Sequence, residues 1–130
     1  MAIIVFDSSV LIGFLDPSDA HHEAAVKAMT RYQQADLVLP ASVYSEILVG
    51  PFRRNEESVT QIEAFVHDFA MQVHLIDRSI ARQAALLRSR HVALRLPDAF
   101  VLATAESLGA DAVLTADKSW LKISRRARVV

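Results

Sequence analysis

Residues 3–9 read IIVFDSS, and this stretch decides the fold class. Its first four residues are apolar without alternation, which is typical of a strand with both faces buried. Asp7 closes the run, and the apolar residues that follow it, Val10, Leu11 and Phe14, have the spacing of a short helix. A buried strand that passes directly into a helix indicates an α/β fold.

The same alternation continues along the chain. Further apolar runs predict strands at 37–40, 73–76, 111–115 and 127–130. Helical patterns lie between them, at 21–34, 42–49, 56–71, 78–90 and 97–109, with a short helix after Asp117. Strands that alternate with helices predict a mostly parallel sheet. We therefore expect a three-layer α/β/α sandwich with about five strands, in a single domain over residues 1–130.

Local signals predict the ends of several helices. Ser42 is placed to cap the helix at 42–49, and Gly50-Pro51 should end it. The composition of residues 50–55 then predicts a loop, and we expect this loop to be the most mobile segment. Pro97 suits a first helical turn, and Gly109 suits a helix end.

Composition narrows the class of protein. The chain has 130 residues, 52% of them hydrophobic, which is enough for a sizeable core and leaves apolar surface that a partner could cover. It has no cysteine, so disulfides and thiolate metal sites are excluded. The first apolar run is too short for a signal peptide, and no run has the length of a membrane span. We expect a soluble cytoplasmic protein.

Charge is divided unevenly between the two halves of the chain. Residues 1–77 carry a net charge of −7 and residues 78–130 carry +6, which together give the overall −1. A basic half can contact phosphates, which are the main source of affinity for nucleic acids. We predict that Arg88 and Arg90 contact RNA. The alternative is that these arginines, with Arg78 and Arg82, only solvate an exposed helix face.

Four acidic residues lie where buried elements begin or end: Asp7, Glu46, Asp98 and Asp117. Each alone could be an ordinary helix cap, a helix-start acid or a surface residue. In parallel sheets, however, the ligand crevice lies beyond the carboxyl ends of the strands, and all four can face it. Four carboxylates brought together need a cation, and Mg²⁺ prefers oxygen ligands.

A metal site of this kind suits hydrolysis of a phosphodiester. Divalent cations lower the pKa of water and act as Lewis acids on the phosphate and the leaving oxygen. Asp7 and Asp98 are the best candidate ligands, Asp117 is expected to complete the set directly or through water, and Glu46 is expected to bind a second ion or orient the attacking water. The hydroxyls of Ser9 and Thr115 can orient a carboxylate or a bound water.

The motifs that carry these acids resemble a known family. Asp7-Ser8-Ser9 after the first strand, Glu46 in a helix, Leu94-x-x-x-Asp98 followed by Ala103-Thr104-Ala105, and Thr115-x-Asp117-x-x-Trp120 look like a PIN domain of the VapC type. The resemblance covers nearly the whole chain, in the expected order. Trp120 stands where phenylalanine is commoner, which affects local packing.

The resemblance implies function as well as fold. It implies an Mg²⁺- or Mn²⁺-dependent endoribonuclease that is the toxin component of a type II toxin–antitoxin system, with Asp7, Glu46, Asp98 and Asp117 as catalytic and metal-binding residues. It also implies an RNA substrate, a cognate antitoxin and a homodimer.

Two alternatives belong to other functional classes. A receiver-like phospho-acceptor module also places acids and Mg²⁺ at strand ends, and Thr115 and Lys118 would suit its switch residues, but such modules need adjacent acids after the first strand. A non-catalytic, RNA-binding PIN domain would usually lack one or more of the acids. The five histidines form no convincing metal set, because His21 and His22 are adjacent and point to different faces of a helix, and His67, His74 and His91 fall on separate elements.

Overall fold

The computed structural model describes all residues from Met1 to Val130, and five parallel strands form its centre. The strand order is β3-β2-β1-β4-β5, and every neighbouring pair is parallel. The sheet is therefore wholly parallel, where the sequence predicted a mostly parallel one. The strands are β1 (Ile3–Phe6), β2 (Asp36–Pro40), β3 (Gln72–His74), β4 (Ala112–Thr115) and β5 (Ala127–Val129).

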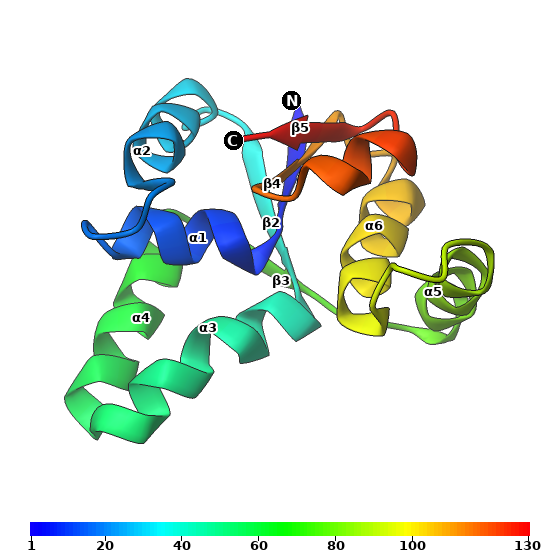
Figure 1. The fold of residues 1–130 in the computed structure, drawn as a ribbon. Coiled ribbons are helices and arrows are strands. Elements are labelled where there is room, and N and C mark those ends of the chain that lie inside the picture. The colour runs from blue at the N-terminus through cyan, green and yellow to red at the C-terminus, as the bar shows by residue number, and fades with distance from the viewer.

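Helices cover both faces of this sheet (Figure 1). Helices α1 to α4 lie on one side, and α5, α6 and the 3₁₀ helix η1 lie on the other. This division follows from right-handed crossovers, because the chain moves one way from β1 to β3 and the other way from β3 to β5. The predicted three-layer sandwich is confirmed. The helices are α1 (Ser8–Leu15), α2 (His22–Arg31), α3 (Ala41–Arg54), α4 (Glu56–Asp68), α5 (Arg78–Arg90), α6 (Leu96–Leu108) and η1 (Lys118–Lys122).

The central strands and α6 account for the apolar runs of the sequence. Ile4, Val5 and Phe6 of β1 are at most 1% exposed, because both faces of this strand are covered. The middle of α6 is buried as well, and its small residues allow it to pack closely on the sheet. Pro97 lies in its first turn, and Gly109 ends it with a left-handed φ of 59°. A continuous hydrophobic core of 28 buried residues results.

The predictions for the end of α3 are wrong. The helix runs through Gly50-Pro51 as far as Arg54, so residues 50–54 are helical and form no loop. Gly50 has no Cβ to clash with the proline ring, which removes much of the usual conflict before a proline. Pro51 is buried, so packing offsets the loss of one backbone hydrogen bond. Asn55 then caps α4 by accepting the backbone N–H of Ser58 at 2.8 Å.

The predicted cap at Ser42 is also wrong. Helix α3 begins at Ala41 with Pro40 in the cap position, and no side chain caps it. The hydroxyl of Ser42 is buried without a hydrogen-bond partner. None of the helices combines the length and apolar content that a membrane span needs.

Candidate active site

The candidate site lies at the carboxyl ends of β1 and β4. These neighbouring strands form the point where the strand order reverses, since β2 and β3 extend to one side of β1 and β5 extends to the other side of β4. Ligand crevices of open parallel sheets form at such a point. Asp7 directly follows β1, and its backbone N–H continues the ladder by donating to the Leu114 carbonyl at 2.9 Å. Asp117 follows β4 by two residues.

Asp7 is a buried carboxylate held by two hydroxyl groups. The residue as a whole is 7% exposed. Its Oδ2 atom accepts hydrogen bonds from Ser9 Oγ at 2.7 Å and from Thr115 Oγ1 at 2.8 Å. Burial raises the pKa of Asp7, and these hydrogen bonds only partly offset that effect.

The two hydroxyls have fixed orientations. Ser9 Oγ accepts the backbone N–H of Ala116 at 3.0 Å, and Thr115 Oγ1 accepts the backbone N–H of Asp117 at 3.1 Å. Each hydroxyl oxygen is thus engaged by a backbone donor, and its own proton is directed at Asp7 Oδ2. This network sets the plane of the Asp7 carboxylate and connects the ends of β1 and β4.

Glu46 approaches from the middle of α3. Ser8 Oγ donates to Glu46 Oε2 at 3.1 Å, and this contact joins the first turn of α1 to α3. The pKa of Glu46 is raised, first by partial burial and then by the negative charges of Asp7 and Asp98. Sequence analysis assigned no role to Ser8. Its position directly after Asp7, at the start of a helix, is the only sequence signal for it.

Asp98 lies in the first turn of α6, where its side chain is 17% exposed. Burial raises its pKa, as does the charge of Asp7. Its Oδ2 atom is 3.5 Å from Nε of Arg95, whose side chain is 77% exposed. The positive charge of Arg95 acts on both Asp98 and Glu46 in the direction that lowers their pKa values. Sequence analysis also missed Arg95.

Asp117 has a structural role of its own at the start of η1. Its Oδ1 atom accepts the backbone N–H of Ser119 at 2.9 Å and the Ser119 hydroxyl at 2.6 Å, so it caps η1. Its charge also contributes to the raised pKa values of Asp7 and Asp98. Asp117 is therefore a helix cap and a neighbour of the other acids at once.

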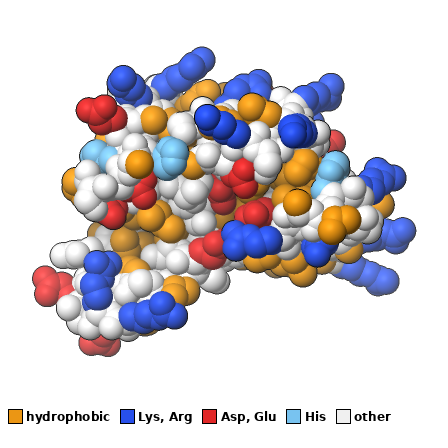
Figure 2. Space-filling model, viewed as in Figure 1, with side chains coloured by type: hydrophobic (Ala, Val, Ile, Leu, Met, Phe, Trp, Pro, Cys, Tyr) orange, Lys and Arg blue, Asp and Glu red, His pale blue; other side chains and the backbone are white.

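The charge of Asp7 acts on Glu46 and Asp98, and the charge of Asp117 acts on Asp7 and Asp98, so the four predicted acids are neighbours at these strand ends. Figure 2 shows acidic side chains gathered in the hollow near the centre of the face, with a basic group against them. Oxygen-only donors of this kind suit a hard divalent cation. No three His, Cys, Asp or Glu side chains stand close enough together to form a ready set of metal ligands.

The two arginines predicted to contact RNA lie at the end of α5 and not on the strand ends that carry Asp7 and Asp117. Arg88 and Arg90 are in the last turn of α5, and neither forms an ion pair. A short connection leads from that turn to α6. Helix α6 begins at Leu96, two residues before Asp98.

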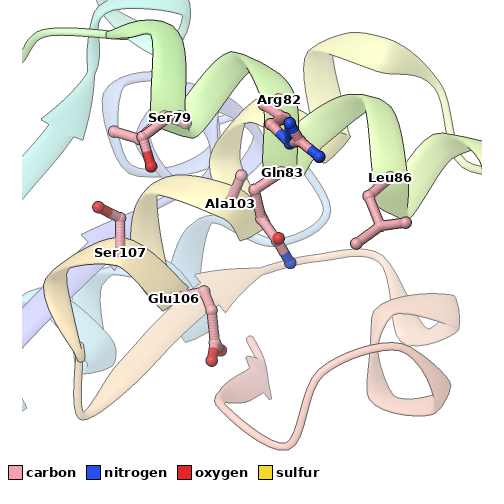
Figure 3. Close-up of a pocket in the computed structure, with 8 residues that line it drawn as sticks. Ser79, Arg82, Gln83, Leu86, Ala103, Glu106 and Ser107 are labelled. Carbon is pink, nitrogen blue, oxygen red and sulfur yellow. The ribbon is translucent and has the colours of Figure 1, made fainter.

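A separate hollow of about 530 Å³ lies between α5 and α6. Figure 3 shows Arg82, Gln83 and Leu86 of α5 and Glu106 of α6 around it. It contains none of the four acids, and the Glu106 carboxylate is paired with Arg126 at 3.2 Å. The candidate catalytic acids therefore lie at the strand ends, outside this hollow.

A parallel α/β sandwich with an acidic crevice at its switch point defines the class of this protein. Sequence comparison gives the family: the model of the PIN domain matches residues 4–126, so the chain belongs to the PIN domain family. No curated protein matches the chain by sequence.

Solved structures agree with this fold. A toxin–antitoxin complex from Klebsiella pneumoniae has a TM-score of 0.76 at 21% identity, over 97% of this chain and 96% of that one. VapBC2 from Rickettsia felis, bound to a promoter DNA fragment, has a TM-score of 0.80 at 10% identity, over 98% of both chains. VapC20 from Mycobacterium tuberculosis, a toxin that cleaves the sarcin–ricin loop, has a TM-score of 0.74 at 18% identity, over 92% of this chain and 93% of that one.

The strand order removes the receiver-like alternative. Receiver modules have the order 2-1-3-4-5, whereas this sheet has the order 3-2-1-4-5. The two arrangements differ in which strand pairs with β1, so no change of register or loop length converts one into the other.

Proposed function

We propose that this protein is a metal-dependent endoribonuclease that hydrolyses RNA phosphodiesters. One observation carries the proposal: four acids from four separate segments lie near one another at the switch point of the sheet, and negative charges among them help to raise the pKa values of Asp7, Glu46 and Asp98. Structural roles alone do not account for this arrangement, since like charges brought together without a function only cost stability.

Asp7, Glu46, Asp98 and Asp117 are the residues that would hold Mg²⁺ or Mn²⁺. A divalent cation supplies Lewis-acid polarisation of the phosphate and makes a water molecule more acidic. Side chains of the protein orient the carboxylates. Ser9 and Thr115 hold the Asp7 carboxylate in one orientation, and Ser8 fixes one oxygen of Glu46.

We further propose that the nuclease is the toxin of a type II toxin–antitoxin pair. The supporting observation is that several similar structures are toxin–antitoxin complexes, including those from Klebsiella pneumoniae and Rickettsia felis. The protein then acts on RNA in the cytoplasm, binds a cognate antitoxin and forms a homodimer. Exposed apolar side chains such as Phe52, Leu75 and Val92 are available for these contacts.

The test of the proposed function is a cleavage assay on structured RNA. Purified protein should cleave in Mg²⁺ or Mn²⁺ and leave a 5′-phosphate and a 3′-hydroxyl. Ca²⁺ should support binding with little cleavage, because its longer and more variable coordination positions water poorly. Cleavage that persists in excess chelator would contradict the metal mechanism. RNA binding without cleavage under any of these conditions would instead indicate a non-catalytic PIN domain.

A further inference from the structure

A small pocket adjoins the acidic crevice on the side of α6. Its volume is about 280 Å³, and it lies between η1 and the turn that joins α5 to α6. Ala93 and Leu94 line it from the turn, and Trp120 lines it from η1. Asp98 and Asp117 belong to the same lining, so the pocket and the crevice share two acids.

The size and lining of this pocket suit one flat ring system. Its volume is just below the roughly 300–1,000 Å³ of pockets that take drug-sized ligands. Trp120 is 1% exposed and is part of the hydrophobic core, so it is held rigidly beneath the floor of the pocket and presents little surface of its own. Its indole N–H has no hydrogen-bond partner in the protein. His91 adds a second aromatic ring to the lining.

A cationic group lies at the same pocket. Lys122 is exposed and lines it, and it forms no ion pair. A lysine at this position can contact a phosphate of a nucleotide whose ring occupies the pocket. Aromatic, apolar and cationic groups around one small volume are the combination that recognises an unstacked nucleotide.

We propose that this pocket binds a single unstacked nucleobase of the RNA, next to the phosphodiester on which the four acids act. The pocket then determines which nucleotide flanks the cleavage site. The inference rests on the proposed nuclease function, because it takes the shared acids Asp98 and Asp117 as the place of cleavage. Recognition of RNA sequence usually depends on bases that have left the stack, and a base in this pocket would have done so.

The sole tryptophan of the chain provides a direct measurement. Each of the four nucleoside 5′-monophosphates is titrated into the protein in chelator, and Trp120 fluorescence is followed, with ribose 5-phosphate as the control ligand. We expect saturable quenching by the nucleotides, strongest for one base, and none by ribose 5-phosphate. Ala93→Phe should fill the pocket and weaken nucleotide binding about tenfold or more. Ala93 is exposed, so this variant should fold.

Two further variants separate the contribution of the pocket to nucleotide binding from that of the Lys122 charge. Ala20→Phe makes the same change at another exposed turn, outside the pocket, and should bind as the parent does. Lys122→Ala should weaken binding of all four nucleotides alike and retain the preference among bases. A second readout is the sequence at the cut site in a mixed RNA, where Ala93→Phe should lose the parent's preference for one flanking base.

The outcomes distinguish this inference from the proposed function. Base-dependent quenching without RNA cleavage would support the pocket and contradict the nuclease. Cleavage by the parent with no flanking preference, and no quenching that Ala93→Phe removes, would overturn the pocket and leave the nuclease intact. Equal quenching by ribose 5-phosphate would show a phosphate site and would also overturn the inference.

Discussion

Thr115 is fully buried at the end of β4, where its hydroxyl donates to Asp7 Oδ2 and accepts the N–H of Asp117. Thr115→Val keeps the shape and removes both contacts. We expect a loss of unfolding free energy of about 1–3 kcal/mol, because a carboxylate and a backbone N–H each lose a partner. Cleavage activity should fall as well, since the orientation of Asp7 depends on this hydroxyl. Denaturant unfolding and the cleavage assay measure the two effects.

Thr104→Val is the matched control. Thr104 is also fully buried, but its hydroxyl donates to the Phe100 carbonyl within α6, one turn earlier. That carbonyl lies in the helix ladder, so the substitution leaves no group without a partner. A cost for Thr104→Val as large as that for Thr115→Val would show that burial of a hydroxyl, and not the network at Asp7, is responsible for the loss.

The raised pKa of Asp7 predicts a specific pH dependence. Because burial raises the pKa in the folded protein, the folded state binds more protons than the unfolded state, and stability falls as pH rises through the folded pKa. Asp7→Asn removes this charge and keeps an oxygen that can accept from Ser9 and Thr115. The stability of the variant relative to the parent should therefore increase from about pH 4 to neutral pH.

Chelator is present in both samples of this comparison, so that metal binding does not contribute. Unfolding free energies across the pH series give the difference between the two proteins. A difference that stays constant with pH would contradict the raised pKa of Asp7.

Helix α5 allows the charge prediction to be tested with its own control. Arg88 and Arg90 lie in its last turn, close in sequence to the connection that leads to Asp98, whereas Arg78 and Arg82 lie near its first turn. Replacing Arg88 and Arg90 with alanine should weaken RNA binding and reduce the salt slope by up to about one unit for each lost phosphate contact.

The corresponding double substitution at Arg78 and Arg82 removes the same charge from the other end of the helix. It should change the slope less, as measured by RNA binding across a salt series. Equal slopes for the parent and the Arg88/Arg90 variant would show that these arginines only solvate the helix.

The elements show which parts of the fold the sequence could predict. Buried strands were recognisable because a short continuous apolar run that stops at a charged residue, such as residues 3–6 before Asp7, is typical of a strand covered on both faces. The end of α3 was predicted wrongly because Gly50-Pro51 usually stops a helix, and only packing around buried Pro51 shows that it does not here. Local propensity was outweighed by a tertiary contact that has no local sequence signal.

The site was predictable to a similar extent. The four acids were predicted as site residues because each interrupts or borders an apolar run. The contact from Ser8 to Glu46 spans 38 positions, and its existence depends on how α1 packs against α3. Arg95 precedes Asp98 by only three residues. It was not predicted as a partner of Asp98, because it is one of ten basic residues in the second half of the sequence. A role that depends on packing between distant segments cannot be predicted from the residues next to it in the sequence.

The order of strands across the molecule decides where the site forms. Sequence predicted a parallel sheet but not its order, and the order places β1 beside β4 at the switch point. In Figure 2 acids line the crevice, and lysines and arginines occupy much of the outer surface around it. An acidic site within basic surroundings suits a cation bound between the protein and a polyanion.

The most direct test of a metal site built from these acids is a thermal melt of the parent and of Asp98→Asn, each in chelator and in Mg²⁺. In chelator the variant should be as stable as the parent or more so, because it removes one of several repelling charges and loses only a pair with the exposed Arg95. Mg²⁺ at about a hundredfold excess over its dissociation constant should stabilise the parent by about 2.7 kcal/mol. The variant should gain much less, because an amide is a poorer ligand for a hard cation. Equal gains in Mg²⁺, or a large loss of stability for Asp98→Asn in chelator, would show that Asp98 is a structural residue and would contradict the assignment of the site.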